Sequence, residues 1–548
     1  MNSTPFAPAR KPWPRATVRP IVLNLLVTAY LLATCNATFW RYLGSALADH
    51  PIARVALGAG FAVWAFFIVS LLSVRRLQKP VLAVLVIVAA VSSYYQDALG
   101  TIIDQTMMQN VLTTTVAEGK HLLTPAMLGH VALRAIPGLF LVFWPRVRRG
   151  RIIPSAPKWV GINAVALAVI VAILAPNLRY FATTLRGHKE LVHTLQPLAT
   201  LNSTLGYVSM VAGAHDIVAQ PYGTDAKKGP LLTTAKKPVL FVFVVGETGR
   251  AANWSLGGYD RDTNPLLSKL DIVYYPHITS CGTETAVSVP CMFSHFGRKN
   301  YSYDKALGSE NLLDVLGHAG FKVHWWDNQT GDKDVAARFH VRFMTKADDP
   351  AACARGECMD GVFLPPLKKF IASMTQDSVL VLHQIGSHGP SYWLRYPPED
   401  EVFKPACHTA QLSDCTNQEL VNAYDDTVVH TDWFLAQVID MLKASTNIES
   451  SLLYVADHGE SLGENGLYLH GAPYWMAPDV QTHVPMLMWL SPTYQHTMDL
   501  SMTCLKDRAA QPASHDNLFS TVLGLLDVQT KVRDNALDLT AGCRKDAG

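Results

Sequence analysis

Long apolar runs near the start of the chain constrain its fold more than any other feature. Five runs have the length, about 20 residues, that crosses a bilayer as a helix. They cover residues 20–40, 55–74, 80–97, 122–145 and 159–178. The five runs contain only two Asp, Glu, Lys or Arg side chains, Asp97 at the end of the third and Arg134 in the fourth, which also holds His130. We therefore expect five transmembrane helices, and for Arg134 two interpretations stay open: a shifted or tilted helix, or an arginine that lines a polar groove.

The basic residues indicate how these spans are oriented, because short loops rich in Lys and Arg stay in the cytoplasm. They gather in the N-terminal tail and in the second and fourth loops: Arg10, Lys11, Arg15, Arg19, Arg75, Arg76, Lys79, Arg146, Arg148, Arg149, Arg151 and Lys158. The tail is then inside, and everything after about residue 180 lies outside the cytoplasm. The first span is followed by further spans, so it is not expected to be a cleaved signal peptide. The net charge of +2 gives no indication of nucleic-acid binding.

Cysteine use agrees with an oxidising compartment. Of nine cysteines only Cys35 lies in a span, which leaves an even number outside. Their spacing suggests three local disulfides, Cys281 with Cys291, Cys353 with Cys358, and Cys407 with Cys415, which leaves Cys504 and Cys543 as a fourth pair. Zinc knuckles would need clustered Cys-x-x-Cys or Cys/His spacing that the chain lacks.

The pattern changes after the last span. Residues 180–237 have mixed composition and are interpreted as a bridging segment between a membrane domain, 1–179, and a catalytic domain, 238–548. Residues 239–245, a run of β-branched and aromatic side chains, predict a buried parallel strand, and similar runs recur at 378–382 and 451–455. Helical stretches at 311–319 and 417–444 alternate with them, which indicates an α/β sheet covered on both faces.

One polar stretch lies between the third and fourth spans. Within residues 103–112, Ile103, Met107 and Val111 stand at helical spacing. Such a helix can lie along the membrane surface. A loop helix packed against the soluble domain is the alternative, and the two stay open.

Polar residues follow the predicted strands directly. Ligands of open α/β sheets bind at the carboxyl ends of strands, where this chain has Glu247, His388, Asp457 and His458. Zinc takes oxygen and nitrogen ligands, so Glu247, Asp457 and His458 are candidate ligands, with the hydroxyls of residues 280–291 near them. A metal-bound hydroxyl ionises more easily and can attack phosphorus, but the residues alone do not decide between Thr283 and Thr285.

Four motifs carry a resemblance to a known family: Gly246-Glu-Thr, SCGTETAVSVPCMFS at 280–294, GSHGP at 386–390, and DHGESLGENGLYLHG at 457–471. They resemble the lipid A phosphoethanolamine transferases, which include the mobile colistin-resistance enzymes. The resemblance covers nearly the whole chain and implies five N-terminal spans, a bridging segment and an alkaline-phosphatase-like domain.

The resemblance also implies site residues. Glu247, Thr285, Asp457 and His458 are the expected zinc ligands, with Thr285 as the nucleophile, and His388 and His470 are expected to bind phosphate or a second zinc. Substrate contacts are expected at Lys333, Gln329, Asn110 and, to the donor's ammonium group, Glu460. The chain departs from the family in Glu284, where a small residue is expected, in Gln329, where some members have Asn, and in Asp332 and Asp334, which flank Lys333 in place of a cysteine pair.

The expected reaction moves phosphoethanolamine from phosphatidylethanolamine to a lipid A phosphate, at the periplasmic face of a bacterial inner membrane, and would confer polymyxin resistance. A monomer that binds no nucleic acid is expected. Alternatives are transfer of phosphoethanolamine or phosphoglycerol to another envelope glycan, a membrane-tethered phosphatase or sulfatase, and an inactive scaffold. A sulfatase would need Cys or Ser at the position of Thr285.

Overall fold

The computed structural model describes residues 15–74, 76–114, 119–148, 152–214 and 216–544. Arg10, Lys11, Arg75, Arg149 and Arg151, which entered the orientation argument, lie outside the described residues. The chain packs as two compact units, residues 1–98 with 125–202, and residues 99–124 with 203–548. The predicted bridging segment, 180–237, is thus divided between the two units.

The first unit is helical. Its elements are α1 (Pro20–Thr34), α2 (Ala37–Ala46), α3 (Pro51–Leu72), α4 (Gln78–Leu99), α7 (Pro125–Phe143), α8 (Ile152–Leu174), α9 (Leu178–Gly187), α10 (Glu190–Thr194), the start of α11 (Leu198–Ala214), and the short paired strands β1 (Thr17–Val18) and β2 (Arg146–Val147). Leu191, Leu195 and Leu198 belong to the same apolar cluster as Phe39 and Leu57, which explains why residues up to 202 pack here.

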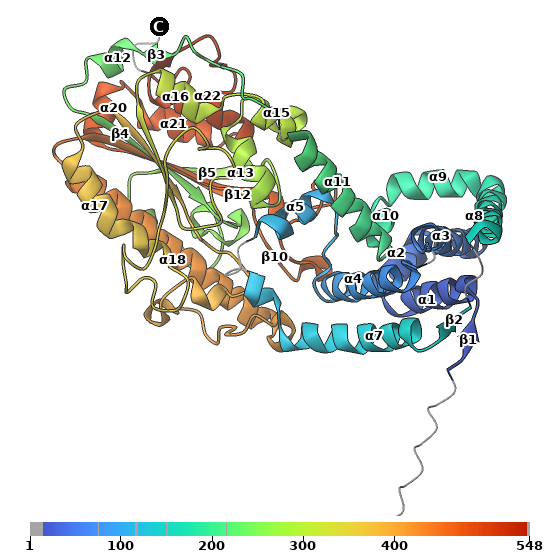
Figure 1. Cartoon of the computed structure of the whole chain (residues 1–548). Coiled ribbons are helices and arrows are strands. Elements are labelled where there is room, and N and C mark those ends of the chain that lie inside the picture. Colours follow the sequence, from blue (N-terminus) through green and yellow to red (C-terminus); the bar gives the residue numbers. More distant parts are fainter. Residues whose placement is uncertain (1–14, 75, 115–118, 149–151, 215, 545–548) are drawn as a thin grey trace, which may run out of the picture. The chain divides into compact units, whose positions relative to one another are not determined.

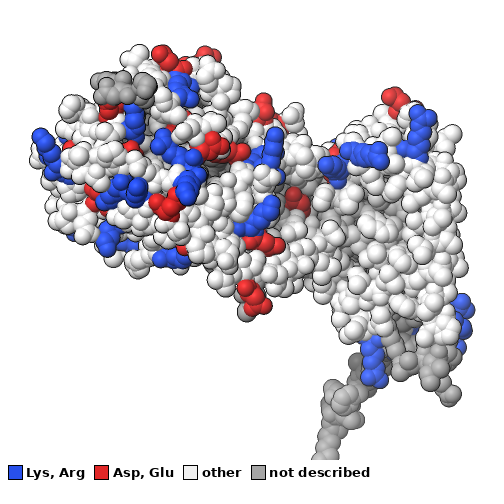
Figure 2. All heavy atoms as spheres, turned by 90° about the horizontal axis from the view of Figure 1, so that it is seen from above, with Lys and Arg blue, Asp and Glu red and all other residues white. Residues whose placement is uncertain are grey.

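Four helices among the described residues are long and apolar enough to cross a membrane: Pro51–Leu72, Gln78–Leu99, Pro125–Phe143 and Ala156–Gly187. The pair α1 and α2 makes a fifth span if the two helices count as one, although they are bent by 70°. The exposed apolar side chains Ile52, Leu133, Ile136 and Val165 belong to these helices. On the face drawn in Figure 2, a wide uncharged belt covers this unit, as expected of a surface in contact with lipid.

The bend between α1 and α2 lies at Asn36, the residue directly before α2. The side-chain amide of Asn36 donates to the carbonyl oxygens of Leu31 and Gln196, and its oxygen accepts from the Gln196 backbone N–H at 2.7 Å. An Asn that bonds the backbone in this way competes with the helical ladder. The continuous helix expected over residues 20–40 therefore breaks at Asn36.

Arg134 lies on α7 inside a polar contact. Its Nε donates to the Thr34 carbonyl at 2.6 Å, its Nη1 lies 2.8 Å from His130 Nδ1, and its Nη2 lies 3.6 Å from an Asp97 oxygen. Of the two interpretations of Arg134, the structure favours the one in which the guanidinium faces protein polar groups.

The second unit is built on an eight-stranded sheet, with strand order β13-β5-β12-β9-β4-β8-β6-β7. The strands are β4 (Val239–Gly246), β5 (Val273–Thr279), β6 (Lys322–Asp327), β7 (Val341–Phe343), β8 (Ser378–His383), β9 (Glu449–Ala456), β12 (His483–Leu490) and β13 (Ala513–Ser514). β4 is parallel to both β8 and β9, whereas β12 runs antiparallel to β5 and β9. All eight residues of β4 are buried, as its uninterrupted apolar sequence predicts.

Helices cover both faces of this sheet (Figure 1). α17 (Leu364–Ser373) and α18 (Asn417–Ala444) lie on one side, and α13 (Thr285–Phe293), α16 (Leu312–His318) and α22 (Leu518–Leu525) lie on the other. α18 begins with a capping box, in which the Thr416 and Glu419 side chains each accept from the other's backbone N–H. The α/β architecture expected for residues 238–548 is confirmed.

The stretch between α4 and α7 also packs in this unit. It forms α5 (Gln105–Thr113), which contacts α13. Ile103 and Met107 are buried, whereas Val111 is 53 % exposed. The structure thus favours the interpretation of this stretch as a helix packed on the soluble domain.

Candidate active site

The ends of β4 and β9 create the site. The two strands pair in parallel with Gly246 opposite Ala456, so Glu247 and Asp457 follow at the same edge of the sheet. The Asp457 N–H donates to the Gly246 carbonyl at 2.8 Å and joins the two strand ends. This register brings together residues 210 positions apart, because parallel neighbours end at a common edge.

Glu247, Asp457 and His458 form a buried cluster able to hold a metal ion, the one group of this kind among the described residues. One ligand atom of each lies within 4.8 Å of the others, and His458 Nε2 is 3.4 Å from an oxygen of each carboxylate. Asp457 Oδ2 is buried and has no hydrogen-bond partner. Two buried carboxylates, one of which has an oxygen without a hydrogen-bond donor, fit a divalent cation, because a buried negative charge is costly unless a cation or a donor compensates it.

The electrostatics of the cluster agree with that fit. Burial, together with the negative charge of Glu247, raises the pKa of Asp457 above its usual range. Burial acts in the same direction on Glu247, but His458 and two further histidines outweigh it and hold the pKa of Glu247 low. A cation would relieve the repulsion between the two carboxylates.

Thr285 is the hydroxyl that faces this cluster. It is the first residue of α13, and its Oγ1 lies 3.1 Å from Glu247 Oε2 and 3.3 Å from His458 Nε2. The Thr283 hydroxyl instead donates to the Ala472 carbonyl at 2.7 Å. The geometry therefore favours Thr285 over Thr283 as the reacting group.

Two histidines lie beside the cluster. The ring centroid of His470 is 4.5 Å from that of His458 and 5.3 Å from that of His388. His470 Nδ1 is 2.9 Å from Glu460 Oε2, and the other oxygen of Glu460 accepts from the Tyr392 hydroxyl. Sequence reasoning missed Tyr392, because nothing in a lone tyrosine after the 386–390 motif marks it as a partner of Glu460.

Comparisons with known proteins agree with this geometry. The family model described as phosphoethanolamine transferase EptA/EptB matches residues 61–211, and the sulfatase model matches residues 240–528. Phosphoethanolamine transferase EptA of Salmonella typhimurium is 38% identical over 97% of this chain and 98% of its own length. Phosphatidylethanolamine transferase Mcr-1 of Escherichia coli is 37% identical over 95% and 98%. The chain belongs to the EptA family of phosphoethanolamine transferases.

A solved structure extends the similarity to the whole fold. The integral membrane lipooligosaccharide phosphoethanolamine transferase A of Neisseria meningitidis matches with a TM-score of 0.91 and 32% identity, over 96% of this chain and 99% of that one. The transferase is thus a multi-pass enzyme of the bacterial inner membrane, with a periplasmic alkaline-phosphatase-like domain.

Of the four predicted substrate residues, Glu460 contacts His470, and the other three lie in different places. Gln329 Nε2 donates to Glu247 Oε2 at 3.0 Å, so this residue touches the cluster itself. Lys333 Nζ donates to the Thr330 carbonyl and hydroxyl at 3.0 and 2.6 Å. Asn110 is half-buried on α5, where its carbonyl accepts from the Thr114 N–H. Their roles toward substrate stay predictions.

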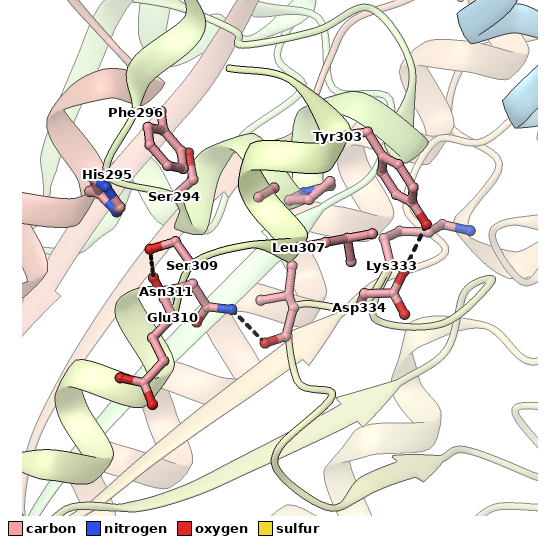
Figure 3. A pocket seen from close by; sticks show the side chains of 13 residues that line it. Ser294, His295, Phe296, Tyr303, Leu307, Ser309, Glu310, Asn311, Lys333 and Asp334 are labelled. Atoms are coloured by element: carbon pink, nitrogen blue, oxygen red, sulfur yellow. Dashed lines mark hydrogen bonds between the residues drawn. The ribbon is translucent and has the colours of Figure 1, made fainter. Parts of the chain in front are cut away.

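Lys333 also lines a small pocket, shown in Figure 3, together with Tyr303, Leu307 and Asn311. Asp334 turns toward Tyr303, whose hydroxyl donates to it at 3.3 Å. Lys333 and Asp334 both have positive φ, 51° and 66°, so this loop is sharply turned.

Glu284, the unexpected neighbour of Thr285, is buried against α5. Burial, with a further contribution from the charge of Asp104, raises its pKa to about 7, although hydrogen bonds from Thr106 and Thr283 oppose the shift. Met107 contacts Gly471 at the same place, because a Cβ added there would lie 2.3 Å from Met107 Cε. The beginning of α5 therefore packs between the Thr285 segment and the residue after His470.

The disulfides join the four expected pairs: Cys281 with Cys291, Cys353 with Cys358, Cys407 with Cys415, and Cys504 with Cys543. The first joins Cys281, in the segment before α13, to Cys291 within α13, the helix that begins at Thr285. Cys35 is a free, buried cysteine of the helical unit.

Proposed function

We propose that the transferase moves phosphoethanolamine from phosphatidylethanolamine to a phosphate of lipid A through a covalent Thr285 intermediate. The observation that carries the proposal is the position of Thr285 Oγ1, within 3.3 Å of both Glu247 and His458. The names of two similar proteins support these two substrates. Mcr-1 is named a phosphatidylethanolamine transferase, and the Neisseria protein is named a lipooligosaccharide phosphoethanolamine transferase.

We propose that the metal is zinc and that its ligands are Glu247, Asp457, His458 and Thr285. When bound there, zinc would lower the pKa of the Thr285 hydroxyl and offset negative charge on the phosphoryl oxygens. Carboxylate, imidazole and hydroxyl are ligands that a catalytic zinc accepts. Gln329 would hold Glu247 in place through its 3.0 Å hydrogen bond.

The reaction has two halves. In the first, the Thr285 hydroxyl loses its proton and Oγ1 bonds to phosphorus while the bond from phosphorus to the diacylglycerol oxygen breaks, and that oxygen takes up a proton. In the second, a lipid A phosphate oxygen bonds to phosphorus while the bond from phosphorus to Thr285 Oγ1 breaks, and Oγ1 takes up a proton. Throughout both halves, His388 and His470 would donate hydrogen bonds to the phosphoryl oxygens. The product carries an added ammonium group, which lowers the negative charge of the outer membrane and so weakens binding of cationic polymyxins.

Mass spectrometry tests the proposal directly. Cells that express the wild-type chain should add one phosphoethanolamine unit to lipid A, whereas Thr285→Ala should add none and still fold. Thr285→Ser is the matched control, because it keeps a hydroxyl in the same place. Intact-mass spectrometry of purified protein with donor alone should show the adduct on wild type and not on Thr285→Ala. Unchanged transfer by Thr285→Ala would contradict the assignment of Thr285 as the nucleophile.

The same experiment separates the alternatives. A phosphatase would release a free phosphate product from the donor without modifying lipid A, and a transferase for another glycan would form the adduct but leave lipid A unchanged.

A further inference from the structure

His515 is a buried histidine outside the cluster that the reaction uses. It follows β13 directly and is 2 % exposed. Its Nδ1 lies 3.1 Å from the Cys281 backbone nitrogen, and its Nε2 lies 3.1 Å from the Ala456 carbonyl oxygen. Cys281 begins the segment that leads to Thr285, and Ala456 immediately precedes Asp457. The imidazole therefore bridges the nucleophile segment and the metal-binding strand end.

The two backbone partners define the state of the ring. A backbone N–H can only donate, so Nδ1 accepts, and a carbonyl can only accept, so Nε2 carries the proton. Both nitrogens are then satisfied by a neutral imidazole. Burial lowers the pKa of His515 to about 3, so the bridge keeps this form at neutral pH.

Ser288 adds a second connection at the same place. It lies one turn after Thr285 on α13, and its hydroxyl donates to the Asp457 carbonyl. Its oxygen is 3.4 Å from His515 Nδ1. In the sheet, β5, which leads into the Thr285 segment, is separated from β9 by β12. His515 and Ser288 connect the two sides directly, without passing through that intervening strand.

We propose that His515 is a positioning residue that sets the distance between Thr285 and the carboxylate and imidazole ligands at the end of β9. The proposal rests on the proposed role of Thr285 as nucleophile. A displacement of about 1 Å between reacting groups can lower a rate by about 100-fold, so loss of the bridge should act on turnover more than on donor binding. The Cys281–Cys291 disulfide does not replace the bridge, because it joins the segment to its own helix.

Two substitutions of His515, each of which keeps one of its two hydrogen bonds, test the bonds to Cys281 and Ala456 separately. In His515→Asn the amide oxygen takes the place of Nδ1 and keeps the bond to Cys281, whereas the bond to Ala456 is lost. In His515→Gln the amide nitrogen takes the place of Nε2 and keeps only the bond to Ala456. His515→Leu keeps neither. The control is His430→Asn, which removes another buried imidazole, bound to Asp400 at 3.0 Å and stacked on Trp433.

The test uses the full-length protein in detergent with phosphatidylethanolamine as donor. We expect kcat of His515→Leu to fall about 10- to 100-fold, with KM for the donor within about twofold of wild type and zinc content unchanged. The Asn and Gln variants should lie between, and the Asn variant should retain more turnover. His430→Asn should lower Tm but leave kcat near wild type.

Several results would overturn the proposal. The first is a kcat of His515→Leu equal to that of wild type. The second is a fall in kcat no larger than that of a control variant that loses the same Tm. The third is a fall in kcat that is explained by a lower zinc content. If no His515 variant folded while His430→Asn did, the ring would be a packing element and the proposal would also fail. Absence of transfer by the wild-type protein would instead reject the proposed function, because every His515 value is a ratio to wild type.

Discussion

The imidazole of His470 is held by the carboxylate of Glu460, whose Oε2 lies 2.9 Å from Nδ1. Glu460 is fully buried, and its other oxygen accepts from Tyr392. Its observed contacts thus orient a histidine, whereas the sequence resemblance implied a contact with the donor's ammonium group. The two roles predict different kinetics.

Glu460→Gln should lower kcat by about 10- to 100-fold, because the charge-assisted bond that orients His470 is lost. If Glu460 acts through His470, kcat should fall equally for phosphatidylethanolamine and for a donor whose headgroup lacks the ammonium. If it binds the ammonium, the loss should be confined to phosphatidylethanolamine and appear in KM. Tyr392→Phe, which removes a neutral hydrogen bond from the same carboxylate, is the milder control.

The strands that carry the site were predictable because their sequences leave little choice. Residues 239–245 are uninterrupted apolar side chains, and β4 is buried along its full length. The residues that follow such strands meet at one edge of the sheet, so the sequence predicts that Glu247 and Asp457 lie together. α18 follows its predicted bounds, because Thr416 and Glu419 mark its start.

Features that depend on distant partners were not predictable. The break at Asn36 requires Gln196, and the orientation of Thr283 requires Ala472, 189 residues away. His515 carries no local pattern that marks it as a bridge to Cys281 and Ala456. The local sequence determines the propensity of a segment for helix or strand, whereas these roles arise from tertiary contacts between segments far apart in the chain.

Metal removal should destabilise the protein through the Glu247, Asp457 and His458 cluster. A ligand that binds only the folded state at 1,000 times its Kd stabilises it by about 4 kcal/mol, so chelation should lower Tm and added zinc should restore it. Asp457→Asn should bind less zinc and lose the response to chelator. Glu310→Gln, which changes an acid outside the cluster, should keep it. An Asp457→Asn protein with full zinc content would contradict the ligand assignment.

The Cys281–Cys291 disulfide should matter for turnover as well as stability. Replacing both cysteines by Ser removes a cross-link over 10 residues. The gain in conformational entropy of the unfolded chain should lower the free energy of unfolding by about 3 kcal/mol. Because Thr285 lies between the two bridged cysteines, adduct formation on donor alone should also slow. The matched control is the double Ser variant of Cys407 and Cys415, a pair separated by 8 residues. It should lose similar stability, measured as Tm, and keep its rate of adduct formation.

Glu284 should make the stability of the protein fall with rising pH. Its pKa is about 7 in the folded protein, against 4.5 for an ordinary glutamate. Between these values the folded chain holds a proton that the unfolded chain has lost. Stability therefore declines as pH rises through this window, by about 3 kcal/mol in total, and the loss is complete above the folded pKa.

Glu284→Gln imitates the protonated side chain at every pH. Its Tm should match that of wild type near pH 4.5 and exceed it at pH 8, measured by thermal unfolding in detergent at each pH. Glu357→Gln is the control of opposite sign: burial raises the pKa of Glu357, but His121 and Arg395 outweigh burial and lower it to about 2. That variant should be less stable than wild type at pH 8, since it loses the ion pair with Arg395 at 2.6 Å. Equal Tm of wild type and Glu284→Gln at pH 8 would mean that Glu284 is ionised in the folded protein without cost.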